Sequence, residues 1–271
     1  MKTMRWWSLC CALCCAAFNV YAGQTLVLIH GYLADGSEWR SSGVVNALQR
    51  AGWQDMGHLV SQGYLAAPQS ATQSSARILY SVTLTSEAPL QVQAQQLANY
   101  LQLLQQRHPQ NSLILVGHSA GGVVARLAVL NPQQQNVQGL ISIASPHLGT
   151  DKAELGVMAN QSPLSWFAPF FGMETLNRSS QLYLDLVRET PSSLLFWLNR
   201  QPHPNIFYAS IVRVNEQNEA NSIVPAYSQD MNNVPALRGK SVSVPSVGLH
   251  SLQFSDGILL AKLLQQSLPD N

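Results

Sequence analysis

The sequence predicts one α/β domain with a mostly parallel sheet, helices on both faces of that sheet and an inserted cap. Short apolar runs that suit buried strands alternate with longer segments of helical periodicity. This alternation breaks only across residues 151–205 and then resumes. With 271 residues, of which 46% are hydrophobic, the chain can fill one sizeable core, and this excludes a disordered protein.

The first 22 residues have the pattern of a cleaved secretion signal. Lys2 and Arg5 give a positive start, residues 6–18 form an apolar run, and residues 20–22 suit a cleavage site. The run is too short to span a bilayer comfortably, so a retained membrane anchor is the weaker alternative. We therefore expect a chain that is secreted, to a periplasm or to the outside, with no transmembrane span once residues 1–22 are removed.

Composition excludes several kinds of site from that mature chain. The chain has four cysteines, all within residues 10–15, so the mature form would hold no disulfide, no thiolate metal site and no cysteine nucleophile. The formal net charge is +1 and only 11% of residues are charged. Because lysine and arginine are not clustered, we expect no nucleic-acid partner.

The first part of the mature chain reads as strands and helices in turn. Strands are expected at residues 25–29, 78–84, 112–116 and 137–144, as short apolar runs typical of strands buried on both faces. Helices are expected at residues 41–51, 89–107 and 121–130. In the longest helix, Pro89 suits the first position, and the apolar positions three to five residues apart are Val92, Leu97, Leu101 and Leu104.

Residues 151–205 form the expected insertion between core segments at residues 23–150 and 206–271. The insertion holds a helix-like run over residues 180–198 and an apolar patch with four aromatic side chains, Trp166, Phe167, Phe170 and Phe171. We expect this patch to contact the substrate if it is a lid over an acyl pocket, although a buried cap would use it equally well. Strands at 206–214 and 241–244 and a helix at 252–264 complete the core.

The most informative stretch is the G-x-S-x-G motif at residues 117–121, between a predicted strand and a predicted helix. In this setting a serine on a sharp, strained turn is raised above the sheet edge, and glycines are needed because the turn leaves no room for neighbouring side chains. Ser119 is therefore the candidate nucleophile. An ordinary turn of small residues is the competing interpretation.

Five short pieces of the chain, in this order, resemble the secreted lipase and esterase branch of the α/β-hydrolase superfamily. They are residues 28–32, 117–122, 145–150, 223–225 and 248–251. The glycine-flanked serine and the Ser-Pro-His-x-Gly-Thr piece are the more specific. The resemblance covers most of the mature chain and implies an α/β-hydrolase fold and an acyl-enzyme on Ser119.

The resemblance also implies an oxyanion hole. Acyl transfer develops negative charge on a carbonyl oxygen, which two backbone N–H groups should meet. By similarity to lipases these come from Tyr32, in the loop after the first strand, and from Ala120, directly after the nucleophile. The alternative for the His30–Gly31 pair is a plain turn at a strand end.

Ser119 needs a base to accept its proton, and the chain has seven histidines. His250 follows the last predicted strand, where the chain order serine, acid, histidine places the base of this fold. His58 and His108 lie in segments that read as surface.

The acid is where the chain departs from its relatives. The slot two residues before the Ile-Val-Pro piece holds Asn221, and a neutral amide can orient an imidazole but cannot stabilise its cation. Glu219 is the favoured replacement, since glutamate is an accepted acid in this fold. Glu216 and Asp230 are the other candidates.

These residues predict a serine carboxylic-ester hydrolase, a lipase or esterase, that acts on lipid or other hydrophobic esters, in solution or at a lipid–water interface. The chemistry needs no cofactor, no convincing metal ligands occur, and a monomer is expected. The same residues would support an acyltransferase or a thioesterase. Asn221 favours a different class, a catalytically weak relative that binds lipid.

Overall fold

The protein is described from a computed structural model, which covers residues 23–61, 63–66, 76–134, 136–151, 179–214 and 223–268. Within these ranges the chain forms one eight-stranded sheet in the order β3-β2-β4-β1-β5-β6-β7-β8. Every neighbouring pair is parallel except β2 and β3, which form an antiparallel pair at one edge. The predicted α/β fold, with its mostly parallel sheet, is confirmed.

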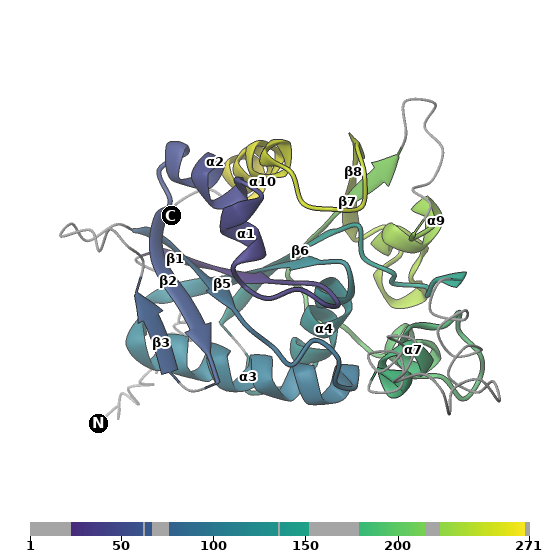
Figure 1. The fold of residues 1–271 in the computed structure, drawn as a ribbon. Coiled ribbons are helices and arrows are strands. Elements are labelled where there is room, and N and C mark those ends of the chain that lie inside the picture. Colours follow the sequence, from purple (N-terminus) through teal and green to yellow (C-terminus); the bar gives the residue numbers. More distant parts are fainter. Residues whose placement is uncertain are drawn as a thin grey trace, which may run out of the picture.

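The elements alternate along the chain much as the sequence pattern predicts (Figure 1). The strands are β1 (Gly23–Ile29), β2 (Gln54–Val60), β3 (Gly63–Ala66), β4 (Arg77–Val82), β5 (Asn111–His118), β6 (Val137–Ile143), β7 (Phe207–Val214) and β8 (Ser241–Val247). The helices are α1 (Glu38–Ser41), α2 (Val44–Arg50), α3 (Leu90–Arg107), α4 (Ala120–Ala128), α7 (Ser180–Leu186), α8 (Leu194–Leu198), α9 (Ala226–Gln229) and α10 (Phe254–Ser267). Two 3-10 turns, Met231–Asn233 and Pro235–Leu237, lie before β8.

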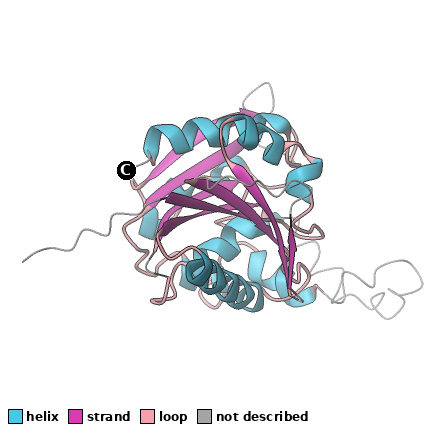
Figure 2. Ribbon diagram, turned by 90° about the vertical axis from the view of Figure 1, so that its left-hand side faces the viewer, coloured by secondary structure: helices cyan, strands magenta, loops and turns pink. Residues whose placement is uncertain are grey.

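Helices cover both faces of the sheet, as Figures 1 and 2 show, and each face has its own apolar core. The alternation of β1 divides its side chains between the two. Leu26 and Leu28 pack with α2 and α10, whereas Val27 and Ile29 pack with α3 and α4. Because both faces are covered, the central strands are apolar throughout, which is why short apolar runs mark them in the sequence.

Three details differ from the sequence expectations. The strands β2 and β3 were not expected, because β2 alternates buried and half-buried residues and carries polar ones next to the edge strand β3. The helix-like run at 180–198 is two short helices, α7 and α8. In the long helix Pro89 is the cap before α3, and Val92 is exposed while Leu90 takes its place in the core.

Two histidines assigned to surface segments are in fact partly buried and hydrogen-bonded. The His58 ring contacts the hydroxyls of Ser81 and Thr83 at 2.8 and 2.7 Å. The His108 ring contacts the Tyr80 hydroxyl at 2.9 Å. These contacts join β2 and the end of α3 to β4 and the residue after it, which periodicity alone does not reveal.

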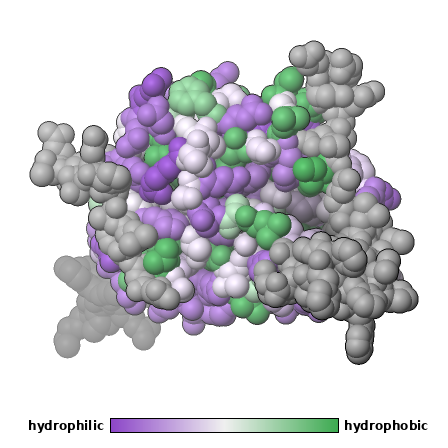
Figure 3. Space-filling view, in the orientation of Figure 1, coloured by the Kyte–Doolittle hydropathy of each residue, from purple (hydrophilic) through white to green (hydrophobic). Residues whose placement is uncertain are grey.

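The surface of the described residues carries its apolar side chains in small separate groups among hydrophilic ones, on the face seen in Figure 3. No helix in the described ranges is both long enough and apolar enough to cross a membrane. The expected signal peptide, residues 1–22, lies outside the described residues.

A buried guanidinium joins α4 to the segment after β6. Arg126 donates to Asn199 at 2.9 Å and contacts the rings of His147 and His203 at 3.4 and 3.3 Å. Since an arginine can only donate, both facing ring nitrogens must be unprotonated acceptors. Burial lowers the pKa of Arg126 to about 9, and burial together with the Arg126 charge lowers the pKa of His203 to about 4.

This arrangement predicts a protein that loses stability on acidification. Burial is the largest cause of a lowered pKa at six of the seven histidines, namely His30, His58, His108, His147, His203 and His250. Below pH about 6.5 the unfolded chain therefore binds more protons than the folded one, so the free energy of unfolding should fall steadily toward pH 4. We expect Tm to decrease over this range.

The matched variant is His203→Gln, which keeps an acceptor in the side chain but cannot take up a proton. Its slope of unfolding free energy against pH, between pH 6.5 and 4, should be shallower by up to about 1.4 kcal/mol per pH unit, the value for one proton. Urea unfolding at a series of pH values measures this slope. Equal slopes for the two proteins would contradict the assignment of His203 as a buried neutral group.

Candidate active site

Ser119 stands at a sharp turn between β5 and α4. Its backbone has φ 50° and ψ −127°, a left-handed conformation that is strained for any residue with a side chain. The flanking glycines are required by contact: a Cβ on Gly117 would lie 2.4 Å from the Gly122 nitrogen, and one on Gly121 would lie 2.4 Å from the His30 carbonyl oxygen. The turn therefore has the strain and the glycine spacing that the sequence predicts.

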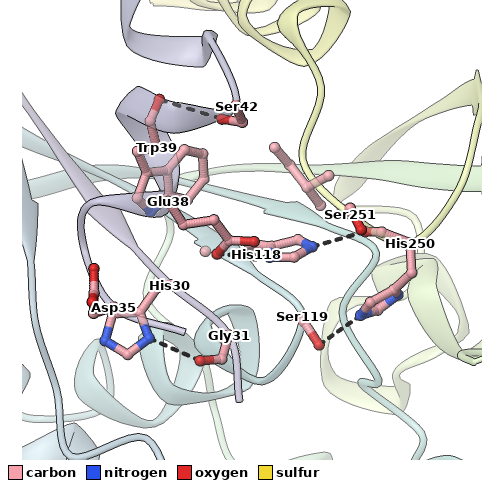
Figure 4. Close-up of polar contacts among 12 residues, drawn as sticks. His30, Gly31, Asp35, Glu38, Trp39, Ser42, His118, Ser119, His250 and Ser251 are labelled. Carbon is pink, nitrogen blue, oxygen red and sulfur yellow. Dashed lines mark hydrogen bonds and ion pairs between the residues drawn. The ribbon is translucent and has the colours of Figure 1, made fainter. Parts of the chain in front are cut away.

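The His250 ring reaches this serine from the loop after β8. Its Nε2 lies 2.9 Å from the Ser119 Oγ, although 131 positions separate the two residues (Figure 4). That distance is within the range in which a base can take a hydroxyl proton. Two residues chosen from the sequence for one proton transfer are thus brought into contact.

The loop after β1 packs directly against the same serine. A Cβ on Gly31 would come within 2.9 Å of the Ser119 Cβ, so only glycine allows this approach. The buried His30 ring accepts a hydrogen bond from the Leu84 N–H, at 2.9 Å, and this leaves its Nδ1 to donate to the Gly31 carbonyl at 2.8 Å. Figure 4 shows this second contact.

The His30 contact determines how Tyr32 presents its N–H. The Gly31 carbonyl and the Tyr32 N–H belong to one planar trans peptide, so they point in opposite directions. With the carbonyl held by His30, the Tyr32 N–H is directed away from that ring. In the part of the chain that the structure describes, no other group accepts the N–H of Tyr32 or of Ala120. In the described part of the chain, these two N–H groups are therefore not engaged by another acceptor.

The Asp230 carboxylate makes no hydrogen bond to the His250 Nδ1 in the structure. The Asp230 carboxylate accepts from the N–H and the side chain of Asn232 at 2.9 and 3.1 Å and so caps the 3-10 turn at 231–233. The His250 Nδ1 is buried and has no hydrogen-bond partner among the described residues. Glu216, Glu219 and Asn221 lie in residues 215–222, outside the described residues.

Charged groups surround His250 on several sides. Burial lowers its pKa to about 4, helped by the neighbouring His118 and Arg213 and opposed by Glu38. The His118 and His250 rings are 5.3 Å apart between centroids. At neutral pH the base is therefore uncharged and able to accept a proton.

A buried ion pair holds the loop that carries His250. Arg213, at the end of β7, contacts Asp256 of α10 at 2.5 Å, and both side chains are 0% exposed. The same guanidinium donates to the Ser246 hydroxyl and to the Ser251 carbonyl, at 2.7 and 3.2 Å. The main chain on the far side of His250 is thus fixed to the sheet by Arg213.

The remaining pieces of the sequence motif also meet in space. The Thr150 hydroxyl donates to the Ile223 carbonyl at 2.5 Å, and the Ser228 hydroxyl donates to the Gly149 carbonyl at 2.6 Å. These bonds join the Ser-Pro-His-x-Gly-Thr piece to the Ile-Val-Pro piece. Both pieces lie near the carboxyl ends of the parallel strands, which is also where Ser119 lies.

Comparisons with known proteins agree with the fold described above. The model of the PGAP1-like alpha/beta domain family matches residues 21–155. Among solved structures, a gene product of Listeria innocua is similar, with 15% identity, TM-score 0.59 and 91% of this chain and 94% of that chain covered. A mature Bacillus licheniformis lipase matches with 16% identity, TM-score 0.56 and coverage of 90% and 91%. A metagenomic carboxyl esterase matches with 17% identity, TM-score 0.52 and coverage of 84% and 65%. No curated protein matches the chain in sequence.

The chain has the fold of the α/β-hydrolases. The resemblance drawn from the motifs is thereby confirmed at the level of the fold. Identities of this size do not establish the reaction, so the chemistry of this protein has to be argued from its own residues.

Part of the segment expected to be an insertion, between β6 and β7, can be described. The Tyr183 hydroxyl of α7 lies 2.7 Å from the Tyr32 hydroxyl, and the Asp185 carboxylate accepts from the Leu90 N–H at the start of α3. This segment therefore contacts the loop that carries the Tyr32 N–H. The aromatic patch Trp166, Phe167, Phe170 and Phe171 lies outside the described residues.

Sequence reasoning missed three residues around the candidate base: Glu38, Arg213 and Asp256. Each is remote from His250 in the chain and lies in no recognisable motif. The neighbours of His118 were also not foreseen, although the residue itself is part of the G-x-S-x-G piece. Only the packing of α1, β5, β7 and α10 brings these groups together. In the described ranges no group of three or more histidine, cysteine, aspartate or glutamate side chains could hold a metal ion.

Proposed function

We propose that the protein is a serine carboxylic-ester hydrolase with Ser119 as its nucleophile and His250 as its base. The observation that carries the proposal is the 2.9 Å contact between the Ser119 Oγ and the His250 Nε2, at a strained glycine-flanked turn. A serine–imidazole contact at such a turn suits acyl transfer better than a structural role, because backbone strain of this kind is concentrated at functional sites.

The reaction follows from the positions of these groups. As the Ser119 oxygen attacks the ester carbonyl carbon, its proton passes to the His250 Nε2, and the negative charge on the carbonyl oxygen is met by the N–H groups of Tyr32 and Ala120. The imidazolium then gives its proton to the departing alcohol, which leaves an acyl group on Ser119. Water, deprotonated by His250, attacks the acyl carbon and releases the acid and the free serine.

A hydrophobic ester is the substrate class that the surroundings favour. Leu33, which follows the Tyr32 loop residue, is 60% exposed, and Leu249, directly before His250, is 77% exposed. Two exposed leucines, one next to Tyr32 and one next to His250, are better matched to an acyl chain or another apolar group than to a charged substrate. The four aromatic residues of the insertion are proposed to extend this apolar surface.

For the acid partner of His250 we propose Glu219, with Glu216 and Asn221 as the alternatives in the same loop. Thioester cleavage and transfer to another alcohol remain compatible with the same groups. A catalytically weak, lipid-binding relative is favoured by one feature, the amide of Asn221 in the usual acid position.

Covalent labelling tests the proposal. A fluorophosphonate should attach to Ser119 in the folded protein, because only an activated serine displaces the fluoride at a useful rate. Peptide mass spectrometry should find the adduct on the peptide that contains residue 119, and p-nitrophenyl esters of increasing chain length should be hydrolysed.

Urea-unfolded protein is the matched control, since unfolding separates Ser119 from His250 and should abolish labelling. A folded protein that neither takes up the label nor hydrolyses any ester of the series would reject the hydrolase and leave the lipid-binding alternative. Labelling without ester hydrolysis would direct the search to thioesters.

A further inference from the structure

A carboxylate and a second histidine are stacked behind the base. The Glu38 Oε2, at the start of α1, lies 3.5 Å from the Nδ1 of His118, and the Nε2 of His118 lies 2.9 Å from the main-chain oxygen of His250. Figure 4 shows the three groups in line, with the His250 ring turned from its carbonyl toward Ser119. The Glu38 Oε2 and the His118 Nδ1 are both buried and have no hydrogen-bond partner in the described part of the chain.

The positions of the protons between Glu38, His118 and the His250 carbonyl follow from which atoms can donate and which can only accept. A carbonyl oxygen can only accept, so the His118 Nε2 must carry a proton and donate it to His250. On the other side a carboxylate oxygen faces the His118 Nδ1, and two bare acceptors at this separation would repel each other. A proton held by either group would lie between Glu38 and His118 and complete the pair.

We propose that Glu38 and His118 form a proton-sharing pair that positions the base, by holding the main-chain carbonyl of His250 while its ring faces Ser119. This inference rests on the proposed function, since it assigns positioning residues to that reaction. Neither residue touches the reacting atoms. Their action passes through the backbone of His250.

The loop around His250 shows why its main chain needs to be held by His118. Leu249, the residue before it, is exposed, and no described residue bonds the His250 Nδ1, the atom that a triad acid usually holds. The main chain is instead held at two adjacent carbonyls, that of His250 by His118 and that of Ser251 by Arg213. Two backbone anchors restrict the ring position much as one bond to Nδ1 would.

The pair also contributes to the charge that faces the imidazole. The groups that act on His250 are His118 from β5, Arg213 from β7 and Glu38 from α1, and Asp256 of α10 neutralises Arg213. With the pair intact, the Glu38 carboxylate is compensated by the proton that it shares. Without His118 that carboxylate would face His250 uncompensated and favour its protonated form.

Two substitutions of His118 separate these effects. A glutamine amide can place its nitrogen near the Nε2 position and keep the bond to the His250 carbonyl, whereas an asparagine amide reaches only the Nδ1 position and loses it. We expect H118N to lower kcat by up to about 100-fold, the effect of a displaced catalytic group, with little change in KM. H118Q should recover most of that loss.

The double variant E38Q/H118N tests the charge. In H118N the pKa of His250 should rise by about one unit, because an uncompensated carboxylate is left nearby. In E38Q/H118N the pKa should return to the wild-type value while kcat stays low, since the anchor is still missing. The pKa is read from the imidazole proton NMR signal of His250, identified by its loss in H250Q, and from the acid limb of kcat/KM.

The NMR reading needs no turnover, so it tests the pair even in a protein that hydrolyses no ester. An inactive, unlabelled wild type would remove the hydrolase, whereas an active wild type with unaltered variants would remove only this inference. The decisive contrary result is an H118N protein whose kcat and His250 pKa both match those of the wild type. If H118N does not fold, the variant E38Q/H118Q replaces it in the test. This variant keeps an amide at both positions, and the inference requires its kcat to be near that of H118Q.

Discussion

Replacing the proposed nucleophile should have the largest effect on activity of any change in this chain. Ser119→Ala removes the atom that is proposed to form the acyl-enzyme, and in a serine hydrolase the corresponding loss is about 10⁶-fold in kcat. The two N–H groups of Tyr32 and Ala120 and the binding surface would remain, so a small residual rate over water is expected. Steady-state hydrolysis of a p-nitrophenyl ester measures the change.

The fold of this variant should be unaffected, because alanine at position 119 must adopt the same φ of 50° and removes only one oxygen. Ser42→Ala is the matched control. The Ser42 hydroxyl donates to the Trp39 carbonyl at the end of α1 and makes no contact with His250. Ester turnover by Ser119→Ala at the wild-type rate, with Ser42→Ala also active, would disprove the assignment of the nucleophile.

The largest loss of stability is expected at the buried ion pair between β7 and α10. Asp256→Asn leaves the Arg213 guanidinium with its charge in a fully buried place, and breaking one side of such a pair costs about 3–5 kcal/mol. The change should also lower kcat in the folded fraction, because Arg213 holds the carbonyl of Ser251 beside His250. Urea unfolding gives the free energy, and kcat is compared at low urea.

Asp230→Asn is the matched control for Asp256→Asn. Asp230 only caps a short 3-10 turn, so Asp230→Asn should cost about 1 kcal/mol or less, with kcat unchanged. Replacing both members of the ion pair by apolar residues should recover part of the lost stability, since the unpaired charge is removed. Similar losses for Asp256→Asn and Asp230→Asn would show that Arg213 does not depend on Asp256.

The central part of the fold could be predicted because its strands are buried on both faces. Such strands are continuous apolar runs, which is how β1, β4, β5, β6 and β7 were found. The edge hairpin of β2 and β3 was missed for the opposite reason. The strand β2, next to the edge strand β3, alternates buried and half-buried positions and carries polar residues such as His58 and Gln54, so its composition resembles that of a loop.

The candidate site likewise contains some residues that the sequence predicts and others that it does not. Ser119 could be chosen because a strained turn admits few residues beside it, and His250 because the order of elements in this fold leaves little freedom for the base. The acid could not be chosen, since any carboxylate in a long loop can reach an imidazole. The position of Asp230 away from His250 appears only when its bond to Asn232 is seen.

The sequence by itself determined the order of strands and helices, the glycine-flanked candidate nucleophile and the histidine that meets it. It could do so because backbone sterics and burial produce recognisable patterns over short stretches of the chain. The tertiary structure alone decided what surrounds that histidine. Glu38, His118, Arg213 and Asp256 come from four elements that meet only when the sheet is assembled, and a contact between residues distant in the chain has no local signature.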